Sequence, residues 1–392
     1  MSPTTPKLSS TAANIPKGVF AELEAKIAER TSRGGDIIGL HIGDTHIAAP
    51  STDIGEMDAG ALRYGVTSGI ASLKEVIAAR VRRERSVPFV TAERIHLGVG
   101  GTHALYCAAR ATLDPGDEVI VLSPYWPLAP GVFTAAGAVP VEVPLTQALY
   151  AGGAPQLRAT LEGARTKKTR GIYFISPNNP DGKIFSHTEL LEIAQFSERH
   201  NLWVYADEVY ADFSFAQPHV SFGALSGVEE RTILVYSFSK SHAIAGARVG
   251  YVVAPLAVIQ QMARVGVHTV FNVPVAMQRV AEAALAAEAE WVPRTREAYR
   301  SARALTSKML TGTGVAFFEP DGGTYHFIDF KPVLAGRPLR ALLEKAIENG
   351  VLLTPGQAFG DYPTSARLCF TAVSEPKLKE GIERLLAAVK SL

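Results

Sequence analysis

A lysine flanked by hydroxyls, glycines and an arginine follows an apolar stretch of the chain. Residues 233–236 are the run Ile-Leu-Val-Tyr, which predicts a short buried strand, and residues 237–250 follow it with Lys240 near their start. Lysine is rarely buried without a partner, so an amine at this place could be a nucleophile that forms a Schiff base with an aldehyde. A surface lysine on a turn is the alternative. If Lys240 is the nucleophile, the rest of the chain should supply the other contacts of an aldehyde cofactor.

A second group of residues could bind a phosphate. The run Gly-Gly-Thr at residues 100–102 precedes a helix that we predict over residues 103–113. Backbone N–H groups at a helix start bind phosphate, and small residues allow close approach. The dinucleotide fingerprint needs a third glycine where His103 stands, so the pattern favours a single phosphate group. Hydroxyls and a guanidinium further along could complete the site: Ser237, Ser239 and Arg248. A surface ion pair is the alternative for the arginine.

Two further turns carry groups that could contact an aromatic ring. Asp207 ends an apolar strand, and Tyr210 follows it. A carboxylate there could pair with a protonated ring nitrogen, which would make the ring an electron sink, while the phenol could donate to a ring oxygen. Asn179 lies in a turn-forming segment and its amide could donate to the same oxygen. The alternatives are a helix N-cap for the aspartate and a plain turn for the asparagine.

An indole and an arginine could complete a small-molecule site. Trp126 follows an apolar strand and could stack on a flat ring or pack in the core. Arg367 lies in an otherwise apolar strand, and a buried arginine needs an anion. A substrate carboxylate would fit its two-pronged geometry, and an internal salt bridge is the other choice.

These side chains follow short apolar strands that alternate with helices. Such alternation predicts an α/β protein with a mostly parallel sheet covered on both faces, whose ligands bind beyond the carboxyl ends of the strands. Since Trp126, Asn179, Asp207 and Lys240 all follow strand ends, one shared site is expected. The predicted strands span residues 95–98, 119–122, 141–143, 171–175, 203–206 and 233–236, and the predicted helices residues 16–33, 70–85, 103–113 and 188–200.

The length predicts more than one domain. We expect a disordered tail over residues 1–14, an N-terminal segment at 15–50 that joins the small domain, a large cofactor-binding domain over 51–290 and a small C-terminal α/β domain over 291–392. A helical segment from about residue 274 to 310 should connect the two domains.

Bulk properties exclude several classes. The formal net charge of +1 over 392 residues gives no basis for nucleic-acid binding, and no apolar run is long enough for a membrane span or a signal peptide. The two cysteines form no framework, which favours a cytoplasmic location. The histidines form no metal-binding motif, so no metal is expected.

Taken together, the motifs resemble those of class I/II (aspartate aminotransferase-like) aminotransferases, which are fold-type I enzymes that depend on pyridoxal 5′-phosphate. The resemblance extends from about residue 16 to the C-terminus. The matching motifs are Asn179-Pro180 with Gly182, Asp207 with Tyr210, Ser237-x-Ser239-Lys240 with Arg248, and Arg367. It implies a three-layer sandwich around a mostly parallel central sheet, with a second, smaller α/β domain.

The resemblance also implies a role for each residue. Lys240 holds the cofactor aldehyde and moves the substrate proton, Asp207 pairs with the ring nitrogen, and Tyr210 and Asn179 contact the ring oxygen. The ring stacks on Trp126. The phosphate contacts are Gly101, Thr102, Ser237, Ser239 and Arg248, joined by Tyr64 from the neighbouring subunit of a homodimer. The substrate carboxylate meets Arg367, the Gly43 backbone, Trp126 and Asn179. Amino transfer between an L-amino acid and a 2-oxo acid would then run in two half-reactions.

Some residues depart from the family pattern. Asp181 stands where threonine is frequent, to which we attach little weight. Asp44 and His46 replace the usual loop residues and either shape a side-chain pocket or cap the loop. The absence of a clear second arginine around residues 268–272 weakens the case for aspartate or glutamate as donor. A C–S lyase or cyclase on the same scaffold is the alternative activity. A ligand-sensing regulator is disfavoured because so few residues precede the first predicted helix.

Overall fold

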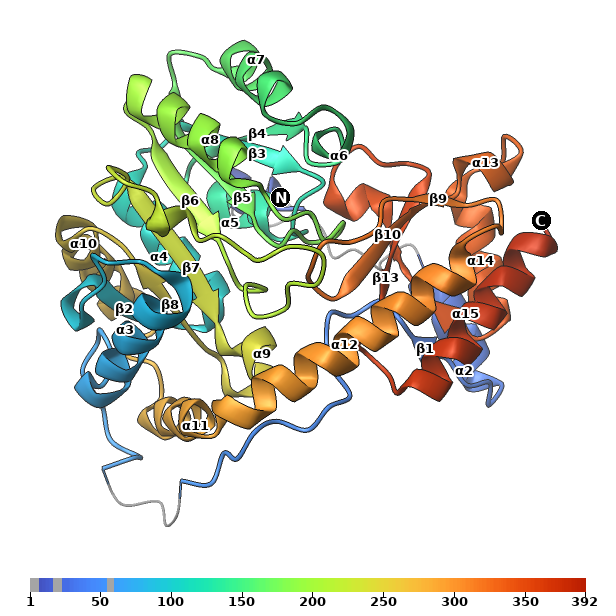
Figure 1. Cartoon of the computed structure of the whole chain (residues 1–392), viewed down its shortest axis with the longest axis horizontal. Helices are drawn as coiled ribbons and strands as arrows, with labels where there is room; N and C mark the ends of the chain where they lie inside the picture. Colours follow the sequence, from blue (N-terminus) through green and yellow to red (C-terminus); the bar gives the residue numbers. More distant parts are fainter. Residues whose placement is uncertain (1–6, 17–22, 55–59) are drawn as a thin grey trace, which may run out of the picture.

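A seven-stranded sheet forms the centre of the protein in the computed structural model, which describes residues 7–16, 23–54 and 60–392 (Figure 1). The strand order is β2-β8-β7-β6-β5-β3-β4. Neighbouring strands from β4 to β7 are parallel, and β8 is antiparallel to both β2 and β7. The predicted α/β class with a mostly parallel central sheet is therefore confirmed. The bounds are β2 Ile95–Val99, β3 Glu118–Ser123, β4 Val139–Pro144, β5 Thr169–Ile175, β6 Trp203–Asp207, β7 Thr232–Ser237 and β8 Val249–Val253.

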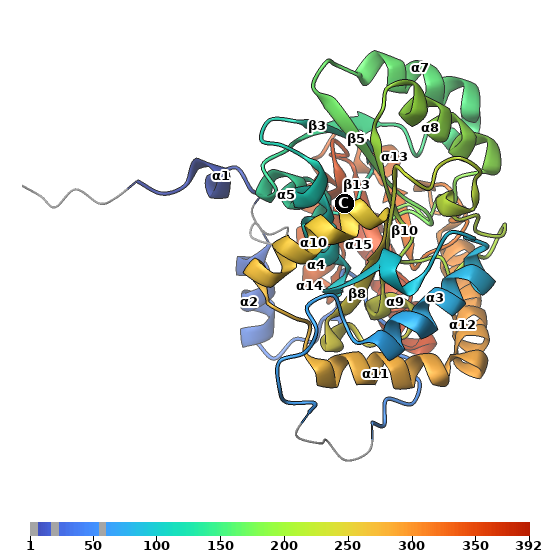
Figure 2. The same cartoon turned by 90° about the vertical axis from the view of Figure 1, so that its left-hand side faces the viewer.

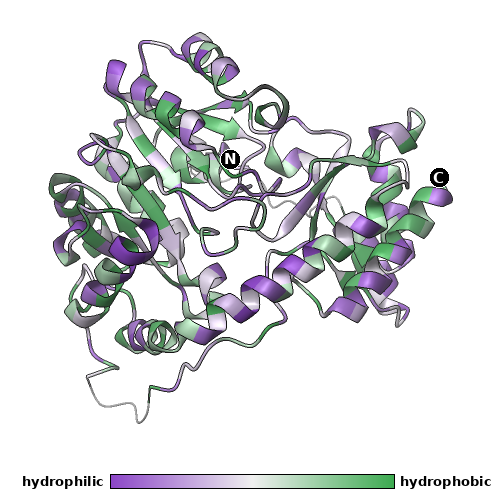
Figure 3. Cartoon of the chain, in the orientation of Figure 1, coloured by the Kyte–Doolittle hydropathy of each residue, from purple (hydrophilic) through white to green (hydrophobic). Residues whose placement is uncertain are grey.

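Helices cover both faces of this sheet, because alternate side chains of a strand point to opposite faces. On β3, Ile120 and Leu122 belong to one core cluster with helices α3 and α8, whereas Val119 and Val121 belong to another with α4, α5 and α10 (Figure 2). The central strands are hydrophobic along most of their length (Figure 3). These layers form the predicted three-layer arrangement. The helix bounds are α3 Ala71–Arg85, α4 Gly100–Thr112, α5 Ala129–Ala135, α6 Leu149–Gly152, α7 Ala154–Ala164, α8 His187–Arg199 and α10 Leu256–Thr269.

A separate core cluster surrounds two smaller sheets. One is antiparallel with the order β12-β13-β10-β9, and the other is the parallel pair β1-β11, which joins residues near the start of the chain to residues near its end. Helices α12, α14 and α15 contribute buried side chains to this cluster. The bounds are β1 Ile38–Gly39, β9 Ala316–Phe317, β10 Tyr325–Asp329, β11 Val351–Leu352, β12 Thr354–Pro355, β13 Ser365–Cys369, α2 Glu24–Ser32, α13 Lys331–Leu334, α14 Leu339–Glu348 and α15 Glu375–Lys390.

The helical segment predicted over residues 274–310 is interrupted. Helix α11 (Val275–Ala286) ends before Ala287, and α12 (Glu288–Leu310) begins after it. Helix α12 then runs along the molecule from α11 to the smaller sheets, where it packs beside α15 (Figure 1). The segment therefore connects the two regions through a break that helical periodicity does not show.

Other differences lie at the ends of the chain and after Arg248. Residues 1–6 of the predicted tail and 17–22 of the first predicted helix lie outside the described residues, and α1 (Ser10–Ala13) forms one exposed helical turn against α5 (Figure 2). Residues 249–253, for which the sequence predicts no strand, form β8. Within the described residues, no helix has the length and apolar character of a membrane span.

Candidate active site

One pocket lies at the carboxyl ends of the central strands and joins residues from distant parts of the chain. It takes lining residues from the start of α4, from the ends of β5, β6 and β7, and from the turn α9 (Phe238–Ser241). This is the edge where parallel α/β sheets bind ligands. The predicted residues that line it are Gly101, Thr102, Trp126, Asn179, Asp207, Tyr210, Ser237, Ser239, Lys240 and Arg248.

The anion-binding end of the pocket is built from the start of α4 and from Arg248. The run of residues 100–102 lies inside α4 rather than before it, so its N–H groups belong to the first helical turn. A side chain at Gly100 would place its Cβ 2.4 Å from Arg248 Nη2, and one at Gly250 would place its Cβ 2.3 Å from the Gly101 nitrogen. The two glycines therefore allow the guanidinium and β8 to approach the helix start. Hydroxyls, N–H groups and a guanidinium form a donor set that fits a phosphate.

Asp207 also lines the pocket, and its carboxylate is buried. Its Oδ2 accepts a hydrogen bond from the Tyr173 hydroxyl at 2.9 Å, and its Oδ1 accepts one from the Val209 backbone at 3.3 Å. Burial raises the pKa of Asp207 from 3.8 to about 6, because these hydrogen bonds offset only part of the cost of desolvation. No cationic side chain of the described residues pairs with it. A positively charged ring nitrogen would supply the missing countercharge, so the part of the pocket around Asp207 fits a pyridinium.

Two further side chains of the pocket lining can donate to a ring oxygen. Asn179 Nδ2 lies 3.5 Å from the Tyr210 hydroxyl, and Asn179 Oδ1 accepts from Arg367 Nη1 at 2.8 Å. Both residues are buried and line the pocket, as the ring-oxygen hypothesis requires. The plain-turn alternative for Asn179 does not explain these tertiary contacts.

Arg367 lies beside this pair on β13. Its guanidinium stacks over the rings of Tyr325 and Phe359, with 4.2 Å and 4.9 Å to the ring centroids, and Nη2 donates to the His41 carbonyl at 2.6 Å. Its Nε has no hydrogen-bond partner in the described structure, and no carboxylate of the described residues forms an ion pair with it. The internal salt bridge that we had considered is therefore not found there, which leaves the cation available to a substrate carboxylate.

Lys240 lines the pocket and contacts Gly43, which is far from it in the sequence. Lys240 is half-buried, and its Nζ donates a hydrogen bond to the Gly43 carbonyl. This contact brings the predicted nucleophile to the predicted substrate-binding backbone. The half-buried indole of Trp126 also lines the pocket, where it packs beside the core cluster of α4 and α5.

Three residues of the sequence hypothesis lie apart from this pocket. Tyr64 is 86% exposed, and its ring contacts Phe271 with 4.9 Å between the ring centroids. Asp44 Oδ1 accepts from the Thr45 backbone at 2.9 Å, and His46 Nδ1 lies 3.1 Å from the Thr371 carbonyl. The contacts of Asp44 and His46 match the loop-capping alternative.

Sequence reasoning overlooked two phenols and gave little weight to one carboxyl. Tyr173 and Tyr325 occur within apolar strands, where nothing local distinguishes a site residue from a core residue. Asp181 is buried, and its Oδ1 accepts from Asn178 Nδ2 at 2.8 Å and from the Lys183 backbone at 3.1 Å. Burial raises the pKa of Asp181 to about 6. Asp181 thus holds the turn that carries Asn179.

The fold and the pocket define an α/β enzyme with a lysine, an anion site and a buried carboxylate at one sheet edge. The family profile of aminotransferase class I and II matches residues 46–385 of the chain. A probable aspartate/prephenate aminotransferase of Thermus aquaticus is 31% identical over 391 residues, 98% of this chain and 99% of the relative. The arginine–pyruvate transaminase of Pseudomonas aeruginosa is 32% identical, over 95% of this chain and 94% of its own.

Solved structures agree with these relatives. A single mutant of Thermus thermophilus aspartate aminotransferase superposes with a TM-score of 0.90 at 31% identity, over 98% of this chain and 100% of that chain. The aromatic aminotransferase of Pyrococcus horikoshii gives a TM-score of 0.84 at 30% identity, over 93% and 99% of the two chains. The chain therefore belongs to the class I and II aminotransferase family. The protein is an aminotransferase, and the lyase alternative is not favoured.

Proposed function

We propose that the protein binds pyridoxal 5′-phosphate in the pocket described above and moves an amino group between an L-amino acid and a 2-oxo acid. The observation that carries this proposal is the arrangement along one pocket of an anion site, a lysine amine and a buried carboxylate without a cation of its own. Membership of the aminotransferase family supports the same cofactor and substrates.

In this proposal, different residues of the pocket bind the ring nitrogen, the phosphate and the ring oxygen of the cofactor. When bound, pyridoxal 5′-phosphate supplies an aldehyde that takes up the amino group and a protonated ring that accepts electrons. Asp207 holds the proton on the ring nitrogen, because its buried carboxylate gains a countercharge only while that nitrogen is protonated. Donor groups bind the phosphate, and two residues donate to the ring oxygen. The phosphate donors are Gly101, Thr102, Ser237, Ser239 and Arg248, and the ring-oxygen donors are Asn179 and Tyr210.

Arg367, the Gly43 backbone and Lys240 would hold and deprotonate the substrate. Arg367 binds the substrate carboxylate through its guanidinium, and the Gly43 backbone lines the same end. The amine of Lys240 would remove the proton from the substrate Cα and deliver it to the carbon of the cofactor's aldehyde group. The indole of Trp126 stacks on the ring and excludes water from it.

The proposal also covers the oligomeric state, the cellular location and the domain boundaries. The exposed Tyr64 suits a residue that reaches the phosphate site of a second subunit, so a homodimer is expected. The two buried free thiols, Cys107 and Cys369, suit the reducing cytoplasm. The core cluster of the smaller sheets supports a small domain over residues 291–392, completed by residues 15–50, beside a large domain over 51–290.

Replacing Lys240 by alanine tests the proposal. We expect Lys240→Ala to lower turnover on the order of 10⁴-fold or more and to remove the visible absorption band of the cofactor-loaded protein, since Lys240 is the one lysine among the described residues that line the pocket. Lys167→Ala, at an exposed turn, serves as the matched control and should keep both. An unchanged spectrum in Lys240→Ala would overturn the assignment.

The amino donor needs a direct screen, because the relatives' names include aspartate, prephenate, arginine and aromatic substrates. Each candidate amino acid is mixed with the cofactor-loaded protein in the absence of an oxo acid. Loss of the visible band with release of the corresponding oxo acid identifies a donor. Release of ammonia and pyruvate without an acceptor would instead indicate the lyase reaction.

A further inference from the structure

Tyr325 lies directly behind the pocket and contacts three of its proposed functional residues. The side chain is buried on β10, and its hydroxyl is 2.8 Å from the hydroxyl of Tyr210. The Arg367 guanidinium stacks over its ring at 4.2 Å from the centroid. An ideal Cβ on Gly43 would lie 1.7 Å from the Tyr325 hydroxyl, so residue 43 must lack a side chain for the phenol to fit. The pocket lining includes Tyr210 but not Tyr325.

The donor and acceptor roles around Tyr210 follow from Arg367. A guanidinium can only donate hydrogen bonds, so the atom of Asn179 that lies 2.8 Å from Arg367 Nη1 must be the amide oxygen. The amide nitrogen of Asn179 therefore faces the Tyr210 hydroxyl at 3.5 Å and donates to it. One lone pair of the Tyr210 oxygen is thereby occupied.

The hydrogen bond between the two phenols has a preferred direction. If Tyr210 donated to Tyr325, the proton of the buried Tyr325 hydroxyl would have no acceptor within the described residues, which is costly. If Tyr325 donates instead, its proton has an acceptor in the Tyr210 oxygen. The proton of Tyr210 then remains free to point into the pocket. The pKa of Tyr210 lies well above its ordinary value because of burial and the neighbouring Tyr325, so this proton is retained. The other groups that influence its titration are Arg367 and Cys369.

We propose that Tyr325 is a positioning residue of the aminotransferase reaction. Its hydroxyl directs the proton of Tyr210 toward the ring oxygen of the bound cofactor, and its ring supports the guanidinium that binds the substrate carboxylate. Arg367, Asn179, Tyr210 and Tyr325 thus form a closed ring of contacts between the substrate and cofactor ends. This inference rests on the proposed function, since it assigns the direction of a hydrogen bond within that site.

Tyr325→Phe tests the hydroxyl, because phenylalanine keeps the ring beneath Arg367. The readout is the pH titration of the visible absorption band of the cofactor-loaded protein. Loss of an oriented donor to the ring oxygen makes that oxygen more basic, so the midpoint should rise by about half a pH unit or more. Tyr210→Phe removes the donor itself and should raise the midpoint further. A Tyr325→Phe protein with lowered thermal stability and an unmoved midpoint would overturn the proposal.

The double variant separates positioning from an independent effect. Because Tyr325 acts through Tyr210, Tyr325→Phe should add no further shift to Tyr210→Phe, and the cycle should show strong coupling. Shifts that add in the double variant would overturn the proposal. The proposed function itself fails in a different way, since the wild-type protein would then show no lysine-dependent band to titrate.

The ring of Tyr325 is tested by comparing leucine with phenylalanine. Tyr325→Leu removes the aromatic face under Arg367, so the KM for the amino donor should rise about fivefold or more. Tyr325→Phe keeps that face and should leave the KM within about twofold while it lowers kcat. Equal KM values for the two variants would overturn the supporting role of the ring.

Discussion

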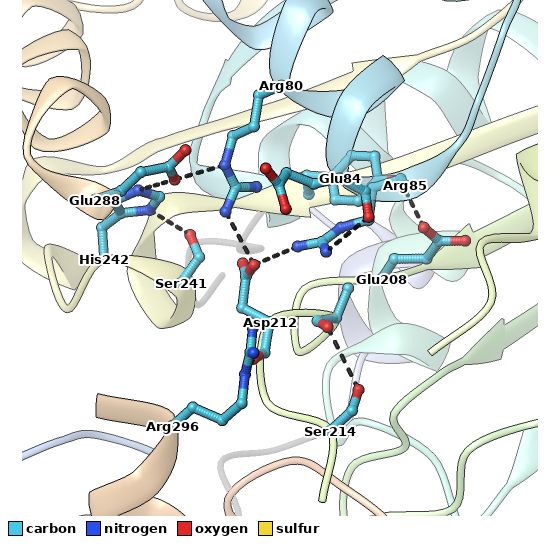
Figure 4. A network of polar contacts seen from close by, with 12 residues as sticks. Arg80, Glu84, Arg85, Glu208, Asp212, Ser214, Ser241, His242, Glu288 and Arg296 are labelled. Carbon is cyan, nitrogen blue, oxygen red and sulfur yellow. Dashed lines mark hydrogen bonds and ion pairs between the residues drawn. The ribbon is translucent and has the colours of Figure 1, made fainter. Parts of the chain in front are cut away.

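Asp207 and Asp212 are two buried carboxylates on one segment of the chain, and their surroundings are opposite. Asp212 Oδ1 accepts from Arg80 Nη2 at 2.9 Å and also pairs with Arg85 (Figure 4). Burial acts to raise the pKa of Asp212, but the two guanidinium groups outweigh it and hold the pKa far below its usual range. Among the described residues, Asp207 accepts hydrogen bonds only from a phenol and a backbone N–H, and burial raises its pKa to about 6.

The charges around Asp212 are balanced within the chain. Glu288 accepts from Arg80 Nε at 2.6 Å and lies 3.1 Å from His242 Nε2, so helices α3 and α12 are tied to the turn after Lys240 (Figure 4). Arg80, Arg85, Asp212 and Glu288 thus each form an ion pair with another side chain of this network. The comparison shows that burial alone does not mark a functional carboxylate. The useful sign is a buried charge whose countercharge the described chain does not provide, because a ligand can then provide it.

Asp212→Asn should produce the largest loss of folding stability among the variants of these two carboxylates. It leaves Arg80 and Arg85 buried without their shared anion, so the free energy of unfolding should fall by about 3–5 kcal/mol. Denaturant unfolding of the ligand-free protein measures this loss. Asp207→Asn is the matched control, since it removes a buried carboxylate that has no cationic partner among the described side chains. Equal losses in the two variants would refute the distinction between them.

Asp207→Asn should instead weaken the reaction. An amide cannot keep the ring nitrogen protonated, so the half-reaction rate should fall by about 10²–10³-fold. Rapid mixing of the cofactor-loaded variant with the amino donor gives this rate directly. A variant that folds normally and reacts at the wild-type rate would remove Asp207 from the site.

The two carboxylates should give the stability opposite dependences on pH. A raised pKa means that Asp207 contributes stability fully below about pH 4 and loses it as the pH rises through about 6, by up to about 3 kcal/mol. The lowered pKa of Asp212 means a contribution that is present above about pH 4 and is lost in acid. Unfolding free energies of wild type and each asparagine variant, measured from about pH 2 to 8, give the two differences. Bound pyridoxal 5′-phosphate should flatten the Asp207 curve, and curves of the same sign would contradict the comparison.

The sequence predicts where the parallel strands end because each strand end is marked by neighbouring residues. Apolar runs followed by a polar residue predict where each parallel strand ends, and the fold class requires those ends to meet. Strand β8 was missed because it follows Arg248, a residue with a φ of 54°, in a segment rich in glycine and alanine that predicts a turn. Its pairing with β2 and β7 depends on residues far away in the sequence.

The remaining parts of the site depend on tertiary contacts. The register of β10 with β13, in which Tyr325 pairs with Cys369 and Phe327 with Arg367, is not encoded in either strand alone. Likewise, nothing near Asp212 in the sequence indicates that its cations come from α3. The difference between Asp207 and Asp212 therefore appears only after the helices have packed on the sheet.

Glu288→Gln should give the smallest loss of folding stability. It tests whether the ion-pair network around Asp212 has a structural role alone. The glutamine oxygen can still accept from Arg80, but the negative charge beside Arg80 and Arg83 is lost, so the free energy of unfolding should fall by about 1–2 kcal/mol. Glu84→Gln is the matched control, because Glu84 forms an exposed pair with Arg83 and should change stability by less than about 0.5 kcal/mol. The half-reaction rate should stay within about twofold of wild type in both variants. A large loss of rate in Glu288→Gln would mean that the network reaches Lys240 through His242, and the separation between structural and functional charges would then be incomplete.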